Sequence, residues 1–556
     1  MDYVTAFLLL HIMKLYQSSF IVILSFFIFS CKQEKSKQYV NPRTEEDISW
    51  HLKDLDEDSV PGISLERLYI EYNLEDKGQE VVVALIDSQI DLFHEDIKNQ
   101  IHINSDELPN NGIDDDGNGY IDDINGWNFL GIDRYNSIKY TNYSDTRFIN
   151  AYQDLFSGID STQIQLGDKE LYRMYLFAVE QHENRKEQDE INMARKDDFY
   201  QIYKNQLALL SDRIPLIDGY TKEELDTVTF NNREEEVVLL NLKMFLKNGV
   251  SFKELQREER LYWIKKSTIN TIGYNDRLKL KEKASDLSDL NYGSNLVDSN
   301  NEEDHATQLA GIIAAERGNG IGIRGISNKI RIMPLAIWAE EGAENEKDFY
   351  TAVKYAVDNG ANIINYSSGI RTPVHPEYFY KALEYAEQHN VLVVVASGNS
   401  GEDNDDKSIL RYYPIDYNKK GDTLNNVLHV SASNENPKQV FAEWANIGAE
   451  SVDLLAPGEN ITTTSKKDSK YFPGNGGTSV SAAITSGVAA MLKSHFPKLS
   501  AKELKLILME SGTSYDMIVN TYAKDSIPFS NITKSGKVLN AYKAYKMAEK
   551  FSKSSL

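Results

Sequence analysis

The chain has 556 residues, 60 basic and 84 acidic side chains, and a formal net charge of −24 at pH 7. Nucleic acid and other anionic surfaces are poor partners for a protein with this charge, because like charges repel. The single cysteine excludes a disulfide bond within the chain.

An apolar run from Phe20 to Ser30 ends directly before the only cysteine, Cys31. An apolar stretch closed by a small residue is typical of a cleaved signal peptide, and one followed by cysteine resembles a bacterial lipoprotein signal. We therefore expect residues 1–31 to be the signal segment, with Cys31 lipidated, and residues 32–49 to be a polar tether. The expected location is the cell envelope of a bacterium, lipid-anchored on the periplasmic side or at the outer-membrane surface.

Two points about the N-terminal segment stay open. A plain N-terminal membrane anchor is the alternative, although no other stretch of sequence reaches the roughly 18 apolar residues of a membrane span. The first twelve residues are themselves apolar, which is unusual for the charged start of a signal peptide. Met13 is therefore an alternative start to Met1.

Two apolar runs lead into polar side chains. After Glu80, residues 81–86 form a continuous apolar run that ends in Asp87, and residues 390–396 lead to Asn399. Such runs are typical of central parallel strands, and in open α/β sheets ligands bind beyond the carboxyl ends of the strands. The Asn399 amide can donate to an oxyanion, a contact worth roughly 2.7–4 kcal/mol of barrier. The alternative for Asp87 is that it only caps a turn.

Residues 114–123 carry five carboxylates, which would repel one another without a cation. Their spacing matches a calcium-binding loop, with a glycine at the sharp turn. The last glutamate of such a loop is replaced by Asn125 and flanking helices are absent, so we expect a calcium-stabilised loop and not a calcium sensor. The alternative is a solvated acidic turn. The expected ligand positions are Asp114, Asp116, Asn118, Tyr120 (backbone carbonyl) and Asp122.

His305 is the best candidate for a catalytic base among the ten histidines. Polar residues precede it and an apolar run rich in small residues follows, so we expect its ring at a helix start facing a cleft. Most other histidines have polar or amphipathic surroundings that are typical of the surface: His51, His102, His375, His389 and His495.

Ser479 lies within the small-residue run Gly476–Ala483, ahead of an apolar helical pattern. A helix N-terminus favours developing negative charge, and glycines let a substrate backbone approach closely. A nucleophilic serine also needs a base and an acid that orients the base, roles that His305 and Asp87 can fill. Taken alone, the segment is equally typical of a packing device.

Asp87, His305, Asn399 and Ser479 together resemble the catalytic residues of the subtilisin-like serine proteases (subtilases, peptidase family S8), which use the order acid, base, nucleophile. The resemblance extends over roughly Trp50–Tyr135 and Tyr292–Lys550. It implies an α/β fold with three layers (α/β/α) around a parallel central sheet. Further segments that resemble the family are the substrate-binding strand at 362–369, the turn at 452–458 and the segment 496–500, which leads into the next helix.

The resemblance implies a serine endopeptidase that acts on protein or peptide substrates. Ser479 would attack the peptide carbonyl, His305 would accept its proton, and Asp87 would fix the histidine tautomer. Asn399 and the backbone N–H of Ser479 would stabilise the oxyanion. An extended substrate would pair with Ser367, Ser368 and Gly369 as an added strand. Structural calcium is a further expectation, and Asp96 with residues 318–323 resembles part of a second calcium site.

An insertion is expected because Asp87 and His305 are 218 positions apart, far more than the fold needs. We expect the peptidase domain at 50–135 and 292–550 and a helical insertion at 136–291. Its role stays open between a simple cover and a lid that gates the site or assists folding. The charged, amphipathic helices predicted within it are Lys169–Arg195, Phe199–Ile214, Glu234–Lys247 and Phe252–Lys266.

Four positions depart from the family pattern. Gln89 and Ala306 replace glycines, Gln308 replaces a histidine and Ala483 replaces a proline. None carries catalytic chemistry, but each can move groups that do, and a displacement of about 1 Å costs about 10²-fold in rate. Two alternatives therefore stay open: a catalytically inactive lipoprotein that binds peptides or a partner protein, and hydrolysis of esters.

Overall fold

The computed structural model describes residues 49–75, 77–209, 222–247, 252–299, 304–466, 470–524 and 526–554. Cys31 and the rest of the predicted signal segment lie outside the described residues, as does the tether apart from residue 49. Among the helices in these ranges, none is both long and apolar enough to cross a bilayer.

The chain divides into two compact units. The larger unit contains Arg43–Ile191 and Leu261–Leu556, and the smaller contains Met1–Pro42 and Asn192–Arg260. The outer parts of the predicted 136–291 insertion therefore belong to the larger unit, and only its middle belongs to the smaller one.

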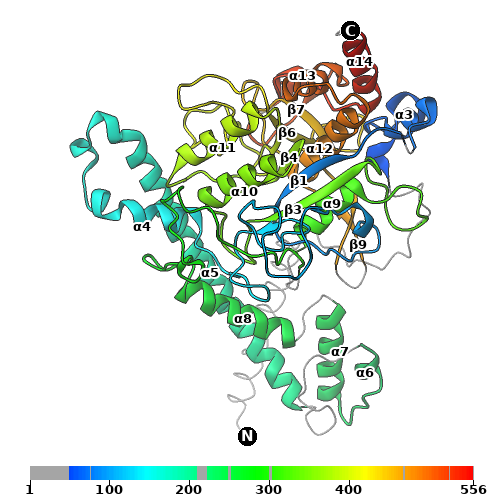
Figure 1. Cartoon of the computed structure of the whole chain (residues 1–556). Helices are drawn as coiled ribbons and strands as arrows, with labels where there is room; N and C mark the ends of the chain where they lie inside the picture. The colour runs from blue at the N-terminus through cyan, green and yellow to red at the C-terminus, as the bar shows by residue number, and fades with distance from the viewer. Residues whose placement is uncertain are drawn as a thin grey trace, which may run out of the picture. The chain divides into compact units, whose positions relative to one another are not determined.

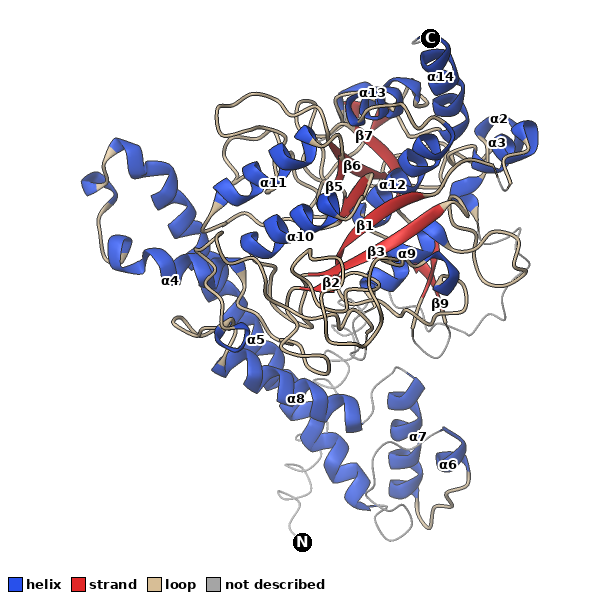
Figure 2. Cartoon of the chain, viewed as in Figure 1, coloured by secondary structure: helices blue, strands red, loops and turns tan. Residues whose placement is uncertain are grey.

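A seven-stranded parallel sheet forms the centre of the larger unit (Figures 1 and 2). Its strand order is β2-β3-β1-β4-β5-β6-β7, so β1 and β4 are neighbours in the middle of the sheet. The strands are β1 Val81–Asp87, β2 Trp127–Asn128, β3 Ile330–Ala336, β4 Ile363–Tyr366, β5 Leu392–Ala396, β6 Val427–Ser433 and β7 Leu454–Pro457. Two antiparallel pairs lie outside this sheet: β8 Ile461–Thr464 with β9 Tyr471–Asn475, and β10 Ile518–Val519 with β11 Ile527–Pro528.

Helices cover both faces of the sheet. Alternate residues of β1 enter different cores: Val83 and Leu85 join one hydrophobic cluster with α9 and α12, while Ala84 and Ile86 join another with α10 and α11. This alternation follows from the two-residue period of a strand and explains why the strand is apolar throughout. The predicted three-layer α/β/α fold is confirmed. The helices of these layers are α9 His305–Ala314, α10 Glu346–Asp358, α11 Pro376–Gln388, α12 Thr478–His495, α13 Ala501–Ser511 and α14 Ala541–Ser554.

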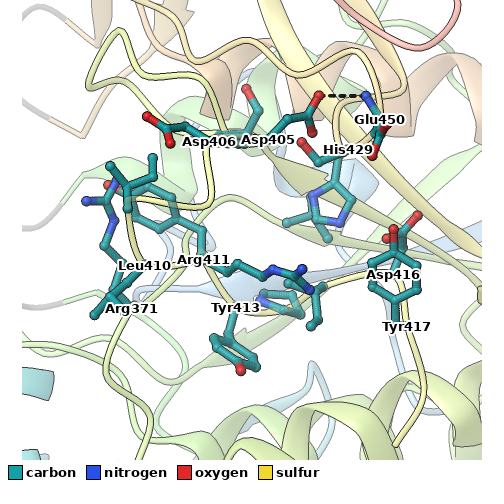
Figure 3. Close-up of a pocket in the computed structure, with 18 of the residues that line it drawn as sticks. Arg371, Asp405, Asp406, Leu410, Arg411, Tyr413, Asp416, Tyr417, His429 and Glu450 are labelled. Carbon is teal, nitrogen blue, oxygen red and sulfur yellow. Dashed lines mark hydrogen bonds between the residues drawn. The ribbon is translucent and has the colours of Figure 1, made fainter. Parts of the chain in front are cut away.

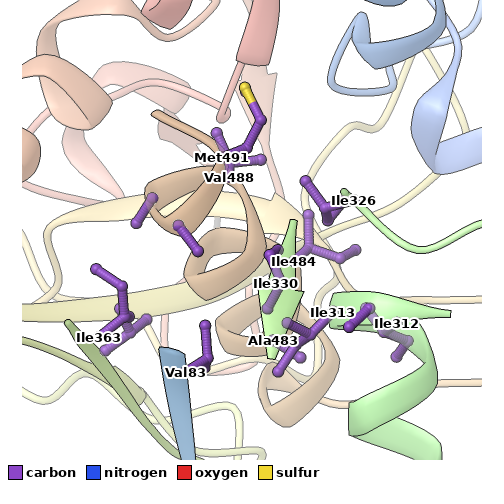
Figure 4. Packing of buried hydrophobic residues seen from close by; sticks show 14 of the residues in the cluster. Val83, Ile312, Ile313, Ile326, Ile330, Ile363, Ala483, Ile484, Val488 and Met491 are labelled. Atoms are coloured by element: carbon purple, nitrogen blue, oxygen red, sulfur yellow. The ribbon is translucent and has the colours of Figure 1, made fainter. Parts of the chain in front are cut away.

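Helix α12 runs through the core (Figure 4). Its side chains Ile484, Val488 and Met491 are fully buried and join a cluster with Ile312 and Ile313 of α9. Burial of each such side chain contributes roughly 1.5–3 kcal/mol. The core therefore fixes the position of α12 along its axis and its rotation about that axis, and so fixes the position of its first turn.

The remaining helices include those predicted for the insertion. Where two helices were predicted, at 169–195 and 199–214, the chain forms one continuous 41-residue helix, α5. The three residues between them are Lys196, Asp197 and Asp198, which do not break a helix as glycine or proline would. Residues 210–214 of the second prediction lie outside the described residues. The other helices are α2 Leu55–Asp58, α3 Leu65–Tyr72, α4 Ser144–Phe156, α5 Lys169–Leu209, α6 Lys222–Asp226, α7 Arg233–Lys247 and α8 Phe252–Ser267.

Buried ion pairs attach the end of the predicted insertion to α10. Arg277 contacts Asp348 at 2.6 Å, and Glu282 contacts Lys347 at 2.6 Å, with all four side chains at most 6% exposed. Removing one member of such a pair typically costs 3–5 kcal/mol, because the other charge stays buried. This part of the insertion is thus joined firmly to the sheet domain.

Candidate active site

Asp87 and His305 meet at the carboxyl end of the central sheet. Asp87 is the last residue of β1, and His305 is the first residue of α9. His305 Nδ1 lies 2.9 Å from Asp87 Oδ1 and 2.8 Å from Oδ2. A carboxylate accepts hydrogen bonds and does not donate them, so Nδ1 carries the proton and Nε2 is left as the basic nitrogen. The Asp87 side chain is fully buried, whereas that of His305 is 24% exposed.

Trp338 supports this pair and was not foreseen from the sequence. Its ring stacks on that of His305, with centroids 5.0 Å apart and planes 27° apart. Its backbone N–H also donates to the carbonyl of Asp87 at 3.2 Å. Trp338 follows the end of β3, the strand beside β1. Its position just past a strand end is the one feature of the sequence that could have indicated a place in the site.

Ser479 is the second residue of α12, and its side chain reaches the segment that follows β4. Its hydroxyl donates to the carbonyl oxygen of Ser367 at 3.2 Å, and the Ser367 hydroxyl donates to the carbonyl oxygen of Ser479 at 3.3 Å. Gly477 precedes the helix with a φ of 149°, a conformation that favours glycine. The helix start and the predicted substrate strand are therefore directly connected.

A chain of buried hydrogen bonds continues from Ser367 into the core. The Asn365 side-chain amide donates to Ser367 Oγ at 3.0 Å, and the Ser486 hydroxyl donates to Asn365 Oδ1 at 2.9 Å. Asn365 and Ser486 are completely buried. Ser486 lies on α12 two turns beyond Ser479. These hydrogen bonds therefore connect β4 to α12 at a second point, in addition to the Ser367–Ser479 contact.

Asn399 has a fixed amide orientation. Its Oδ1 accepts hydrogen bonds from the backbone N–H of Thr478 at 2.9 Å and from the Thr478 hydroxyl at 2.8 Å. Both partners are donors to this oxygen, so the Nδ2 group points elsewhere. A Cβ placed on Gly477 would lie 3.6 Å from Nδ2, which locates the NH₂ group at the entrance to α12. Among the described residues, none accepts a hydrogen bond from this group.

The predicted substrate strand Ser367–Gly369 extends β4 beyond its last residue, Tyr366. Ser368 and Gly369 are half-buried. A cavity of about 490 Å³ lies beside Ser368 and the end of β5 (Figure 3). The charged and histidine side chains that line it are of both signs: Glu170, Arg173, Arg371, Asp405, Asp406, Lys407, Arg411, Asp416, His429 and Glu450.

The two polar departures from the family pattern tie loops to the site. Gln89 Nε2 donates to the carbonyls of Leu296 at 2.8 Å and Asp298 at 3.0 Å. Gln308 Oε1 accepts from Asn475 Nδ2 at 2.9 Å. Neither side chain separates Asp87 from His305.

The two alanine departures are buried within helices. Ala306 is 1% exposed, and its backbone N–H donates to the Ser88 hydroxyl at 3.2 Å. Ala483 is fully buried inside α12, which continues through it without interruption. Alanine favours this outcome because it retains the backbone N–H that proline lacks.

The acidic loop gathers a different set of carboxylates from the predicted one. One ligand oxygen each from Glu107, Asp114 and Asp116 lie within 4.8 Å of one another. Glu107 was missed because it precedes the loop. Asp122 is turned to the backbone instead, where its oxygens accept from the N–H groups of Asn111 at 2.9 Å and Gly112 at 3.1 Å.

The other two expected ligand positions, Asn118 and Tyr120, have partners within the loop and in β2. Asn118 Oδ1 accepts from the backbone N–H of Tyr120 at 2.8 Å, and its amide donates to Asp116 and Asp123. The Tyr120 ring packs edge-on against Trp127, with centroids 5.0 Å apart.

Asp96 is paired with the loop that was expected to share a cation with it. Its two carboxylate oxygens accept from Asn319 Nδ2 at 2.8 Å and from the backbone N–H of Ile323 at 2.9 Å. Burial raises the pKa of Asp96 to about 6. The loop thus supplies two donors to this carboxylate.

Comparison with known proteins identifies the family. Residues 78–530 match the Subtilase family. The cell wall-associated protease of Bacillus subtilis (strain 168) is 30% identical over 224 residues, which are 40% of this chain and 23% of that protein. Subtilisin DY of Bacillus licheniformis is 27% identical over 210 residues, 38% of this chain and 70% of that protein. The major intracellular serine protease of B. subtilis (strain 168) is 34% identical over 194 residues, 34% of this chain and 55% of that protein.

The matches thus span less than two thirds of two of these three relatives. Among solved structures, one of the subtilase cytotoxin SubAB assembly aligns with 28% identity and a TM-score of 0.38, over 47% of this chain and 81% of that one. A lanthipeptide protease structure aligns with 24% identity and a TM-score of 0.36, over 45% of this chain and 77% of that one. On the match over residues 78–530, the chain belongs to the subtilase family.

Proposed function

We propose that this protein is a serine endopeptidase that hydrolyses peptide bonds with Ser479 as nucleophile, His305 as base and Asp87 as the acid that orients it. The observation that carries the proposal is the Asp87–His305 contact of 2.8–2.9 Å at the end of the sheet that also positions Ser479. Membership of the subtilase family supports serine protease activity.

The first half of the proposed reaction forms an acyl-enzyme. In the free protein the Ser479 hydroxyl donates to Ser367, so it must first rotate toward His305 Nε2. Ser479 Oγ then bonds to the substrate carbonyl carbon while its proton passes to Nε2, and the Asp87 carboxylate stabilises the imidazolium. Collapse of the tetrahedral intermediate breaks the C–N bond, and His305 returns the proton to the leaving amine. Water hydrolyses the acyl-enzyme by the same steps.

Two donors would stabilise the oxyanion. The Asn399 NH₂ group lies at the entrance to α12 and keeps its orientation through Thr478. The backbone N–H of Ser479 is in the first turn of α12, where the helix has no intrahelical acceptor for it. The helix dipole favours negative charge at the same place. Loss of one such donor typically costs about 10²–10³ in kcat.

The test is hydrolysis of internally quenched peptides by the purified protein. Wild type should cleave within the peptide, and Ser479→Ala and His305→Ala should each lower kcat by at least about 10³-fold. A folded wild type that cleaves no peptide would favour the inactive, peptide-binding alternative. Cleavage of ester substrates alone would favour the esterase alternative.

We also propose that the protein binds structural calcium at the loop around Glu107, Asp114 and Asp116. The donors fit a hard cation, because all three are carboxylate oxygens. No lysine or arginine among the described residues forms an ion pair with any of them, although Glu107 is only 4% exposed. Bound calcium would offset the repulsion between these charges and hold the loop against the sheet domain.

The proposed location is the bacterial cell envelope, with a lipid on Cys31 as the anchor. Support comes from the sequence alone, where the apolar run 20–30 stops at Cys31. Since Cys31 is the only cysteine, an alkynyl fatty acid fed to cells that produce the full chain should label wild type and leave Cys31→Ser unlabelled. Wild type that is soluble and unlabelled would contradict the anchor.

A further inference from the structure

A buried carboxylate, Glu344, lies against the predicted substrate strand. Its Oε1 accepts hydrogen bonds from the Ser368 hydroxyl at 2.7 Å and from the Tyr366 hydroxyl at 2.7 Å. The residue is 6% exposed and lies two positions before the first residue of α10. Glu344 therefore contacts the middle residue of the segment that we expect to bind substrate.

Glu344 has no cationic partner among the described residues. Arg147 contacts this segment but donates to the backbone carbonyls of Ala343 and Glu344. The two groups that do bond the carboxylate are neutral hydroxyls, and the other carboxylate oxygen, Oε2, accepts no hydrogen bond from the described part of the chain. By contrast, the buried Asp348 on α10 is paired with Arg277.

Two hydroxyl donors stabilise a charge on Glu344 less fully than a cation would. A buried negative charge loses hydration, and neutral donors return only part of that energy. A cation that arrived with the substrate would supply the missing partner. Hydrogen bonds between charged groups are about twice as strong as neutral ones.

The side chains of the strand alternate in a way that places Glu344 beside a bound peptide. Ser367 bonds to Asn365 and Ser479 on the α12 side, whereas Ser368 bonds to Glu344. Successive residues of a strand point to opposite faces, and residues opposite each other on paired strands share a face. A substrate side chain that lies opposite Ser368 would therefore pass close to the Glu344 carboxylate.

We propose that Glu344 forms a subsite for a cationic side chain, lysine or arginine, in the substrate segment that pairs with Ser367–Gly369. The inference rests on the proposed function, because it assumes that peptides bind along this strand. The net charge of −24 is consistent with it, since an acidic protein attracts cationic peptides.

The test compares peptides that differ in one charge. Quenched peptides with a common scissile bond are synthesised with lysine or with norleucine, its uncharged analogue, at each position on either side of that bond. At one position wild type should cleave the lysine peptide about tenfold faster in kcat/KM, which is the size expected for one charged hydrogen bond. Glu344→Gln, which keeps the shape and the acceptor oxygen, should reduce this preference to about twofold or less.

Glu340→Gln is the matched control. Glu340 is four residues away, pairs with Lys139 at 2.8 Å and has a side chain 23% exposed, so this variant removes the same charge without touching Ser368. It should retain the wild-type preference. If both glutamine variants lost the preference for lysine equally, the preference would come from the overall negative charge of the protein and not from a contact with Glu344. That result would overturn the subsite.

Labelling by a fluorophosphonate separates this inference from the proposed function. Wild type and Glu340→Gln should label at similar rates, because the probe carries no peptide segment. Failure of wild type to label or to cleave any peptide would be a failure of the proposed function. If wild type is labelled and cleaves peptides but shows no preference for lysine at any position, the subsite is wrong while the proposed function stands. This comparison needs no variant.

Discussion

Ser367 and Ser479 exchange a pair of hydrogen bonds, each hydroxyl donating to the other residue's carbonyl oxygen at 3.2–3.3 Å. One residue belongs to the predicted substrate strand and the other is the proposed nucleophile. The bond from the Ser367 hydroxyl does not use the Ser479 hydroxyl, so it can hold the strand beside the first turn of α12 while that hydroxyl rotates toward His305. The geometry of both bonds depends in turn on Asn365 and Ser486 in the core.

Ser486→Ala should lower peptidase activity although Ser486 does not touch the substrate. Loss of its hydroxyl leaves Asn365 Oδ1 without its donor, so the strand and helix shift relative to each other, and we expect kcat/KM to fall about tenfold, since a 1 Å shift costs about 10²-fold. Ser494→Ala is the control, because Ser494 is a buried serine of the same helix that bonds to the carbonyl of Gln79. Both variants should lose stability; equal kcat/KM in the two would refute the role of Ser486.

Asn399→Ala should reduce kcat by about 10²–10³-fold and leave KM nearly unchanged, because the lost hydrogen bond forms only as the oxyanion develops. Asn399→Asp distinguishes this loss from a loss of shape. An aspartate still accepts the bonds from Thr478 but has no donor for the oxyanion. Steady-state kinetics in which Asn399→Asp retains wild-type kcat would show that the amide only positions Thr478.

Much of the fold could be predicted because it depends on local patterns. The apolar run that ends in Asp87 is the central strand β1, and the small-residue run around Ser479 does begin helix α12. These patterns reflect burial on both faces of a parallel sheet and within a core helix, so they are visible in a short window of sequence.

The supporting residues could not be predicted because their partners are distant in the chain. Ser486 and Asn365 are 121 positions apart, and neither stands out from its neighbours. Glu107 contributes to the acidic cluster but precedes residues 114–123, whose spacing predicted the calcium loop. Glu344 lies in a loop with several other acidic residues, so nothing in the sequence distinguishes it. Only the folded topology brings these residues to the site.

Calcium should stabilise the wild-type protein through the Glu107 loop. A ligand present at 100 times its Kd adds about 2.7 kcal/mol, so Tm should rise on moving from chelator to calcium. Glu107→Gln removes one charged ligand and should abolish most of that rise. Glu95→Gln alters a half-buried acid that is paired with Lys470 and should keep the rise. A wild-type Tm that is the same in calcium and in chelator, as measured by calorimetry, would exclude the site.

The ionised Asp453 carboxylate should contribute to the free energy of unfolding, and this contribution should be lost in acid. Burial raises the pKa of this carboxyl, but Lys505 and Lys534, each 3.2 Å away, outweigh burial and hold the pKa below its usual value of 3.8. A pKa lowered by folding contributes stability above pH 3.8 that is lost as pH falls through the folded-state value. Asp453→Asn should therefore cost about 3–5 kcal/mol at pH 7, because Lys505 loses its carboxylate partner and Lys534 retains only Asp416.

Urea unfolding at several pH values measures this effect. The difference between wild type and Asp453→Asn should be constant from pH 7 to 5 and shrink below about pH 4. Glu510→Gln, which breaks an exposed pair with Lys537, should cost less than about 1 kcal/mol throughout. A difference for Asp453→Asn that does not vary with pH would contradict the assigned cause.

The most direct test of the account is covalent labelling of the nucleophile. Folded wild-type protein with calcium is treated with a fluorophosphonate probe, and the labelled peptide is located by mass spectrometry. We expect one adduct, on Ser479, and no labelling of Ser479→Ala, with Asp87→Asn labelled about 10⁴-fold more slowly than wild type. Absence of an adduct on folded wild type, or an adduct that persists in Ser479→Ala, would contradict the proposed catalytic role of Ser479.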